Sequence, residues 1–140
     1  MIIVVPGEPV GKGRPKFSTR NGYARAYTPK KTADYESEVL AAYYRQCKGE
    51  HYEKAQYLDL SVRAYLSIPE SASKKKKELM RQGKIRPAKK PDIDNIYKIC
   101  CDALNGVAFP DDCQITDGGM HKWYSDNPRV EIEIKEAEEE

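Results

Sequence analysis

The chain lacks any long apolar run, and this absence excludes a membrane protein. Charged residues make up 33% of its 140 residues, and its mean hydropathy is -0.79. No stretch approaches the roughly 18 consecutive apolar residues that a membrane-spanning helix needs. The N-terminal MIIVVPGEP also has no basic residue ahead of its short apolar run. We therefore expect no signal peptide and a cytoplasmic protein.

The number and spacing of the cysteines and histidines do not fit a disulfide framework, a zinc site or the active site of a nucleophilic hydrolase. The four cysteines include no CxxC pair, and the adjacent Cys100 and Cys101 suit neither a disulfide framework nor a zinc site. We expect reduced, partly buried thiols. The two histidines, His51 and His121, lie near no serine or cysteine pattern of the kind that nucleophilic hydrolases use.

Length and apolar content predict one small domain that spans residues 1–140. This length is typical of a single domain, and 39% hydrophobic residues supply one core rather than two. No internal repeat or long linker divides the chain. The glutamate-rich residues 136–140 are expected to form a frayed acidic tail.

The net charge of +2 conceals a strong asymmetry along the chain. Residues 1–91 hold 20 Lys and Arg against 9 Asp and Glu, whereas residues 92–140 hold 4 against 13. Such an imbalance within one domain indicates a basic surface beside an acidic cluster. A merely solvated, soluble surface is the alternative, although it does not predict the closely spaced aspartates of the second part.

Hydrophobic periodicity predicts an α/β (α+β) fold in which helices pack on a mixed β-sheet. The last two strands are expected to be antiparallel neighbours. Thr28 and Pro29 read as the N-cap and first residue of a helix, Gly106 as a C-cap, and Asn21-Gly22 as a hairpin turn. The expected elements are strands at 2–5, 58–68, 114–124 and 129–135, helices at 29–47, 71–82 and 95–105, and a hairpin over 16–28.

The segment KKPDIDNIYK, residues 89–98, is the strongest chemical signal in the chain. Asp92 and Asp94 follow Pro91, which favours extended backbone, and alternate side chains of an extended chain share one face. Lys98 lies one helical turn beyond Asp94. Two carboxylates and a lysine suit a hard divalent cation with its phosphate substrate. The open alternative is structural, with Asp94 as an N-cap that pairs with Lys98.

A second acidic pair, Asp111-Asp112, follows the predicted third helix. Eleven helical residues carry the chain about 16 Å away from Asp94. The six residues from Gly106 to Asp111 can return up to about 20 Å when extended. The two pairs can therefore meet, and carboxylates gathered around one site would repel one another without a metal ion. An exposed turn before a strand is the alternative for this pair.

Two basic stretches have the composition of a nucleic-acid-binding surface. In the first, cations surround Phe17, Tyr23 and Tyr27, and aromatic rings can pack on sugars or unstacked bases. The second leads directly into Asp92. A solvated helix face is the ordinary alternative for a run of charges. The candidate DNA-binding residues are Lys12, Arg14, Lys16, Lys74, Lys75, Lys76, Lys77, Lys89 and Lys90, with Arg20 and Arg25 on the predicted hairpin.

The string KPDIDNIYKICCDALNG…FPDDCQI resembles the signature of RusA-type Holliday junction resolvases, which are small phage-derived endodeoxyribonucleases. The N-terminal PGEPVGKGRPKF and the C-terminal strand pair also fit, so the resemblance covers most of the chain. It implies a homodimeric, Mg²⁺-dependent enzyme with a RusA-like α/β fold, in which Mn²⁺ can substitute. Such an enzyme binds four-way DNA junctions and nicks two opposed strands in recombination and repair.

The resemblance also implies the roles of particular residues. The essential acidic residues of the family fall on Asp92, Asp94 and Asp112, which would be catalytic and bind the metal ion, and the essential lysine falls on Lys98. Asp111 matches an acidic neighbour and is a further candidate ligand. The choice of Asp112 over Asp111 depends on the following Gln114-Ile115.

Two other functions stay open from the sequence. The chain could be a nucleic-acid-binding module without catalysis, in which the carboxylates serve as caps and ion-pair partners. It could also be a metal-dependent phosphohydrolase that acts on small phosphates. Cleavage of a synthetic four-way junction with and without Mg²⁺ separates these functions.

Overall fold

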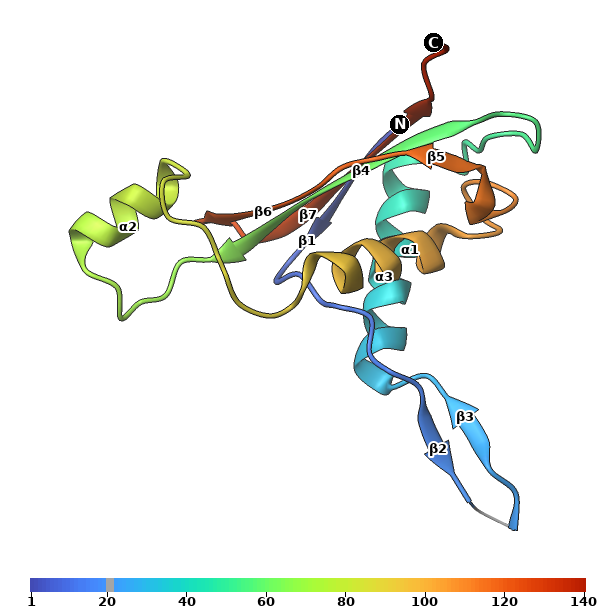
Figure 1. Cartoon of the computed structure of the whole chain (residues 1–140), viewed down its shortest axis with the longest axis horizontal. Helices are drawn as coiled ribbons and strands as arrows, with labels where there is room; N and C mark the ends of the chain where they lie inside the picture. The colour runs from blue at the N-terminus through green and yellow to red at the C-terminus, as the bar shows by residue number, and fades with distance from the viewer. Residues whose placement is uncertain (20–21) are drawn as a thin grey trace.

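The computed structural model describes residues 1–19 and 22–140, which form a sheet with helices on one face and a projecting hairpin (Figure 1). The elements in chain order are β1 (Ile2–Pro6), β2 (Lys16–Ser18), β3 (Arg25–Tyr27), α1 (Lys30–Cys47), β4 (Leu58–Ser67), α2 (Lys74–Arg81), α3 (Ile93–Leu104), the short 3-10 turn η2 (Asp112–Gln114), β5 (Ile115–Asp117), β6 (Met120–Ser125) and β7 (Arg129–Glu136). The α+β fold expected from the periodicity is confirmed.

Strand β4 is the centre of the main sheet. It pairs antiparallel with β7 along one edge and parallel with both β5 and β6 along the other, and β1 completes the sheet beyond β7. Its alternate residues, from Leu58 to Leu66, are buried, while the residues between them point to the opposite face. A parallel partner requires a crossover connection, and the segment that carries α2 and α3 supplies it.

Two expectations about the C-terminal strands are wrong. Residues 114–124 form two strands rather than one, because the chain is interrupted at Gly118 and Gly119 between β5 and β6. These strands are also not neighbours of β7, since β4 lies between them. The central position gives β4, with its long alternating apolar pattern, hydrogen-bonded partners on both edges, so neither edge is available to a second molecule.

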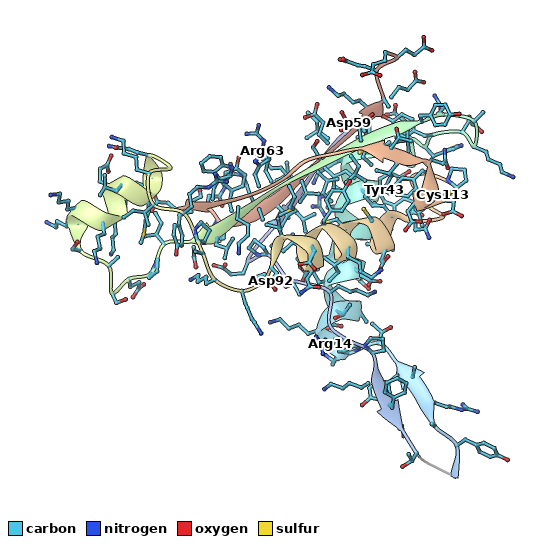
Figure 2. All side chains as sticks on the ribbon, in the orientation of Figure 1. Arg14, Tyr43, Asp59, Arg63, Asp92 and Cys113 are labelled. Carbon is cyan, nitrogen blue, oxygen red and sulfur yellow. The ribbon has the colours of Figure 1, made fainter. Side chains whose placement is uncertain are left out.

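Helices α1 and α3 cover one face of the sheet (Figure 1). Tyr35, Val39 and Tyr43 form the buried stripe of α1, and Ile96, Ile99 and Cys100 belong to the corresponding stripe of α3. These side chains join the apolar face of β4 in one hydrophobic cluster. On the opposite face Arg63 projects outward (Figure 2), and the end of α2, with Met80 and Arg81, lines a pocket together with Arg63 and Tyr65.

Helix α1 begins one residue later than expected, because Pro29 is its N-cap and Lys30 its first residue. Helix α2 begins after Ser73, whose hydroxyl accepts a hydrogen bond from the Lys76 N–H. Gly106 follows α3 with a φ of 76°, as a helix C-terminus favours.

The two ends of the molecule project from this core. The β2–β3 hairpin is confirmed and extends away from the sheet, while α2 lies at the other end (Figure 1). The expected turn residue Asn21 and the neighbouring Arg20 lie outside the described residues. Strand β7 reaches Glu136, and Ala137 still donates a hydrogen bond to the Tyr57 carbonyl, so the residues without regular structure begin later than expected.

All four cysteines are free, as expected, with Cys100 and Cys101 buried and Cys113 exposed. Among the described residues, no helix combines the length and the apolar character needed to cross a bilayer.

Candidate active site

The start of α3 separates the two aspartates that the sequence places together. Helix α3 begins at Ile93 rather than Asn95, so Asp92 is its N-cap and Asp94 lies in its first turn. The expected extended backbone from Asp92 to Asp94 is therefore wrong, because Ile93 and Asp94 are helical. Within the described residues, neither carboxylate accepts a hydrogen bond or forms an ion pair, and the Asp92 side chain does not cap the helix. Both acidic groups are exposed and available to a ligand.

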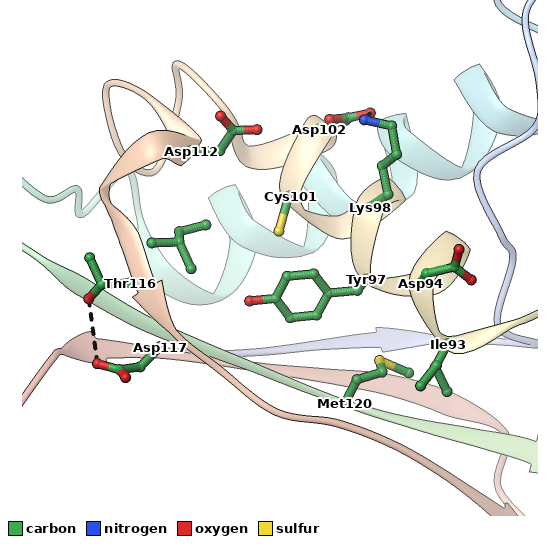
Figure 3. Close-up of a pocket in the computed structure, with 11 residues that line it drawn as sticks. Ile93, Asp94, Tyr97, Lys98, Cys101, Asp102, Asp112, Thr116, Asp117 and Met120 are labelled. Atoms are coloured by element: carbon green, nitrogen blue, oxygen red, sulfur yellow. Dashed lines mark hydrogen bonds and ion pairs between the residues drawn. The ribbon is translucent and has the colours of Figure 1, made fainter.

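Asp94 faces a groove of about 580 Å³ that runs along α3 and is closed on its far side by β5 and the start of β6 (Figure 3). We call it the α3 groove. The helix residues that line it recur every three to four positions, which places them on one stripe. The lining residues are Ile93, Asp94, Tyr97, Lys98, Cys101, Asp102, Asp112, Ile115, Thr116, Asp117 and Met120.

The α3 groove thus contains three of the predicted site residues, Asp94, Lys98 and Asp112. It also contains Asp102 and Asp117, which the sequence analysis missed. The spacing of Asp102, four residues after Lys98, is a signal that could have indicated it. Asp117 offered no comparable signal, because its position depends on the pairing of β5 with β4.

Lys98 is paired with Asp102 and not with Asp94. Its Nζ lies 3.6 Å from the Asp102 carboxylate, and Figure 3 shows the side chain directed toward that residue. The structural alternative in which Asp94 pairs with Lys98 is therefore wrong. A lysine on the wall of an acidic groove can contact a phosphate that enters it.

Lys12 completes the same ion-pair network from the N-terminal loop. Its Nζ lies 2.6 Å from Glu36 of α1 and 3.1 Å from Asp102, and the Lys12 side chain is only 20% exposed. Burial lowers the pKa of Lys12, but the hydrogen bonds to both carboxylates outweigh that effect and raise it. Lys12, a predicted DNA contact, is thus engaged inside the protein and links the loop to both helices.

The side chains of Gln114 and Asn105 hold the turn that carries Asp112, whose N–H donates to Asn105 Oδ1 at 3.0 Å. Gln114 is buried; its amide donates to the carbonyls of Glu53 and Gln56 at 2.8 and 2.9 Å, and its Oε1 accepts from the Asp111 N–H at 3.1 Å. The Asp111 carboxylate caps η2 by accepting from the Cys113 N–H at 3.1 Å. Asp112 then lines the α3 groove, whereas Asp111 does not.

Adjacent carboxylates shift the pKa values at this turn in opposite directions. A side-chain hydrogen bond with Asp111, followed by desolvation, raises the pKa of Asp112. The backbone N–H of Cys113 and the same carboxyl pair lower the pKa of Asp111. Burial, followed by the charges of Asp112 and Asp102, raises the pKa of Cys101 to about 12, which favours the protonated thiol.

The α3 groove offers the donors that a hard cation prefers. Its lining includes four aspartates and no histidine, and carboxylates suit Mg²⁺ better than softer metals. No three His, Cys, Asp or Glu side chains within residues 1–19 and 22–140 are grouped as a metal cage. Mg²⁺ is usually held by one or two carboxylates together with water and substrate phosphate. The chemistry of the donor set therefore fits this ion.

Asp92 lines a second groove, of about 990 Å³, between the base of the hairpin and the start of α3. We call it the hairpin groove. Four of the predicted DNA-binding residues, Lys12, Arg14, Lys16 and Lys90, also line it. Figure 2 places Arg14 near the base of the hairpin and Asp92 at the start of α3. The predicted cations thus flank one of the predicted catalytic carboxylates.

The other predicted DNA-binding residues lie elsewhere. Lys74, Lys75 and Lys76 are exposed on α2, whereas Lys77 is half-buried and interacts with Asp126. Lys89 is exposed, and its ammonium lies 5.6 Å from the centre of the Tyr124 ring. The basic candidates therefore lie at three places, which are the base of the hairpin, helix α2 and the segment that joins α2 to α3.

Comparison with known proteins identifies the family. Residues 6–135 match the family described as Endodeoxyribonuclease RusA, which is nearly the whole chain. The chain belongs to the RusA endodeoxyribonuclease family. This confirms the resemblance carried by the DxDN and DDCQI segments, and it indicates an endodeoxyribonuclease.

A relative from Bacillus subtilis (strain 168), the uncharacterized protein YqaN, is 40% identical over 135 residues. The alignment covers 95% of this chain and 94% of the relative. The RusA match contains both grooves, since their lining residues lie between positions 6 and 135. All the predicted site residues of this RusA-family chain lie within the matched segment.

Proposed function

We propose that this chain is a Mg²⁺-dependent, structure-specific endodeoxyribonuclease that resolves four-way DNA junctions as a homodimer. The observation that carries the proposal is the α3 groove, in which Asp94, Asp112 and Lys98 line one surface of a RusA-family protein. Carboxylates for a cation beside a lysine for a phosphate are the groups that metal-assisted phosphodiester hydrolysis requires.

Asp94 and Asp112, which line the α3 groove, would hold the metal ion, and Asp92, at the N-terminus of the same helix, is proposed as a third ligand from the adjoining groove, with Asp111 as a further candidate. When bound, Mg²⁺ supplies an activated water and neutralises charge on the attacked phosphate. Lys98, oriented by Asp102, donates to an oxygen of that phosphate and stabilises the charge that develops during the reaction. The lysine and the carboxylates have separate tasks, because a protonated lysine cannot ligate a metal.

A homodimer suits the substrate, because a two-fold symmetric protein presents two equivalent sites to two opposed strands of a junction. Both edges of β4 are already paired, so a dimer cannot form by strand addition there. We propose that a partner packs instead on the face of the sheet opposite α1 and α3, which carries the exposed Arg63. Light scattering should give a mass near twice 16.0 kDa; a monomer at micromolar concentration that still cuts junctions would contradict the dimer.

The deciding experiment incubates the full-length protein with a synthetic four-way junction and with a linear duplex of the same sequence. Paired, symmetrical nicks in the junction that require Mg²⁺ or Mn²⁺ and disappear with a chelator support the proposal. Junction binding without any nick indicates a binding module. If the protein neither binds nor cuts DNA but hydrolyses small phosphate esters, the resolvase and the binding module are both contradicted.

A further inference from the structure

The β2–β3 hairpin exposes aromatic side chains that no part of the described protein covers. Phe17 and Tyr23 are 73% and 74% exposed, and Tyr27 is 50% exposed. In the register of the hairpin, Phe17 lies opposite Ala26, while Tyr27 lies opposite Lys16 on the other face. An isolated two-stranded ribbon is at best marginally stable in water. Its uncovered aromatic rings therefore indicate a surface that another molecule covers.

The base of the hairpin is firmly attached to the core. The Lys12 N–H donates to the Asn95 carbonyl at 2.9 Å, and the Gly13 N–H donates to Thr32 Oγ1 at 3.0 Å. Glycine is required for this close approach, since a Cβ at Gly11 would lie 2.9 Å from a carbon of Pro91. The hairpin thus projects from a fixed base that contacts both α1 and α3 (Figure 1).

The charge of this region favours one kind of partner. Residues 14–31 carry six Lys or Arg and no Asp or Glu. Arg14 and Lys16, at the base of the hairpin, line the hairpin groove, and Lys90 and Asp92 line the same groove. A row of cations beside exposed rings is the composition of a surface that holds a nucleic-acid backbone and stacks on its bases. The row ends at a proposed catalytic carboxylate.

We propose that the hairpin is an arm that binds the branch point of the DNA junction. Phe17 and Tyr23 stack on bases that lack a continuous neighbour there, and the cations at the base direct the phosphate backbone along the hairpin groove toward Asp92. This inference rests on the proposed function and adds to it the element that distinguishes a branched substrate from a linear one. Stacking is tolerant of sequence because every base has a flat face.

The test compares full-length Phe17→Ala and Tyr23→Ala proteins with Tyr57→Ala, a matched control. Tyr57 is 70% exposed and lies next to β4, outside both grooves. Fluorescence anisotropy in a chelator measures binding to a four-way junction, a linear duplex and a single strand. A 2-aminopurine base at the branch point reports stacking directly. Circular dichroism melting shows whether each variant keeps the parental fold.

We expect each hairpin variant to bind the junction about 5- to 150-fold more weakly, which corresponds to the loss of one stacked base. The quenching of 2-aminopurine should be lost with it. The slope of affinity against salt concentration should not change, because no charge has been removed. Duplex binding, and every property of Tyr57→Ala, should stay within twofold of the parent.

If the parental protein cuts junctions and both hairpin variants bind them with unchanged affinity, the proposal that the hairpin binds the branch point is overturned. The proposal is also overturned if the hairpin variants are monomers, the parent is a dimer and their DNA affinity is unchanged. The hairpin would then bind a second copy of the chain. A parental protein that neither binds nor cuts junctions contradicts the proposed function instead. In that case, binding to the single strand tests the arm. The same losses of affinity in the hairpin variants support the arm, and unchanged affinity overturns it.

Discussion

Lys98 and Asp102 lie one helical turn apart on α3, with the lysine Nζ 3.6 Å from the Asp102 carboxylate. Asp102 simultaneously pairs with Lys12 at 3.1 Å. One carboxylate therefore holds the lysine of the α3 groove and the loop that supports the hairpin. The Asp94 carboxylate, which the spacing alone pairs with Lys98, is left without a protein partner in the described residues.

Replacing Asp102 with asparagine should release Lys98 while keeping the size of the side chain. We expect kcat for junction cleavage to fall about 10- to 100-fold, as small displacements of a catalytic group often cause. KM should stay near the parental value. Asp34→Asn, which removes an exposed partner of Lys30, is the matched control. A parental kcat in Asp102→Asn would show that Asp102 does not orient the lysine.

The proposed ligands can be tested with Asp92→Asn, Asp94→Asn and Asp112→Asn. Each variant should fold but lose nearly all cleavage, because the amide keeps the size of the side chain and removes the charge that holds Mg²⁺. Junction binding without metal should persist or strengthen, since a negative charge near DNA phosphates is gone. Asp126→Asn, on the surface beside Arg81, should cut at the parental rate.

Lys98→Ala should also abolish cleavage but leave the binding of Mg²⁺ largely intact, as titration calorimetry can measure. A variant Asp94→Asn that resolves junctions at the parental rate would refute the assignment of that carboxylate.

Lys12→Met should destabilise the protein, although the sequence marks Lys12 as a DNA contact. The change leaves the half-buried Glu36 without a cation and leaves Asp102 with Lys98 alone, and we expect a loss of about 1–3 kcal/mol in the free energy of unfolding by urea. Lys30→Met removes a lysine that is 91% exposed, so its cost should stay below about 0.5 kcal/mol. Equal stability of the two variants would contradict the network.

Gly118→Ala should strain the contact between α3 and the sheet. A Cβ at this position would lie 2.3 Å from the Leu60 carbonyl oxygen and 2.5 Å from the Tyr97 hydroxyl. Those two groups are joined by a hydrogen bond of 2.7 Å. We expect the free energy of unfolding, measured by thermal denaturation, to fall by about 1–3 kcal/mol. The adjacent Gly119→Ala, whose Cβ would come no closer than 3.4 Å to any neighbour, should be nearly neutral.

The lysines of α2 should contribute affinity and not chemistry. Replacing Lys74, Lys75 and Lys76 with alanine removes three exposed cations, and the slope of log affinity against log salt should fall by about 0.9 for each DNA phosphate that is no longer neutralised. The cleavage rate at saturating protein should not change. Lys77→Ala, at a half-buried position near Asp126, should alter the slope less. Unchanged affinity and slope would identify a solvated helix face.

Local pattern was sufficient for much of this protein. The alternation in β4 and the helical stripes of α1 and α3 follow from periods of two and of about 3.6 residues, which short-range backbone geometry imposes. The hairpin over residues 16–28 follows from the turn signal Asn21-Gly22. The string from Asp92 to Ile115 likewise indicated the family, because it combines several residue types at set spacings. That string by itself marks Asp92, Asp94, Lys98 and Asp112 as site candidates.

Tertiary structure decided how those residues are arranged. Because α3 starts at Ile93, Asp92 and Asp94 line different grooves. The observed start lies two residues before the expected one, and local sequence propensities do not define a helix end that closely. The partner of Lys98 is Asp102 rather than Asp94, although both are four residues away, and Lys12 joins them from a distant loop. Asp117 reaches the α3 groove only because β5 pairs with β4. Long-range contacts of this kind depend on the packing of the whole chain, and sequence spacing carries no record of them.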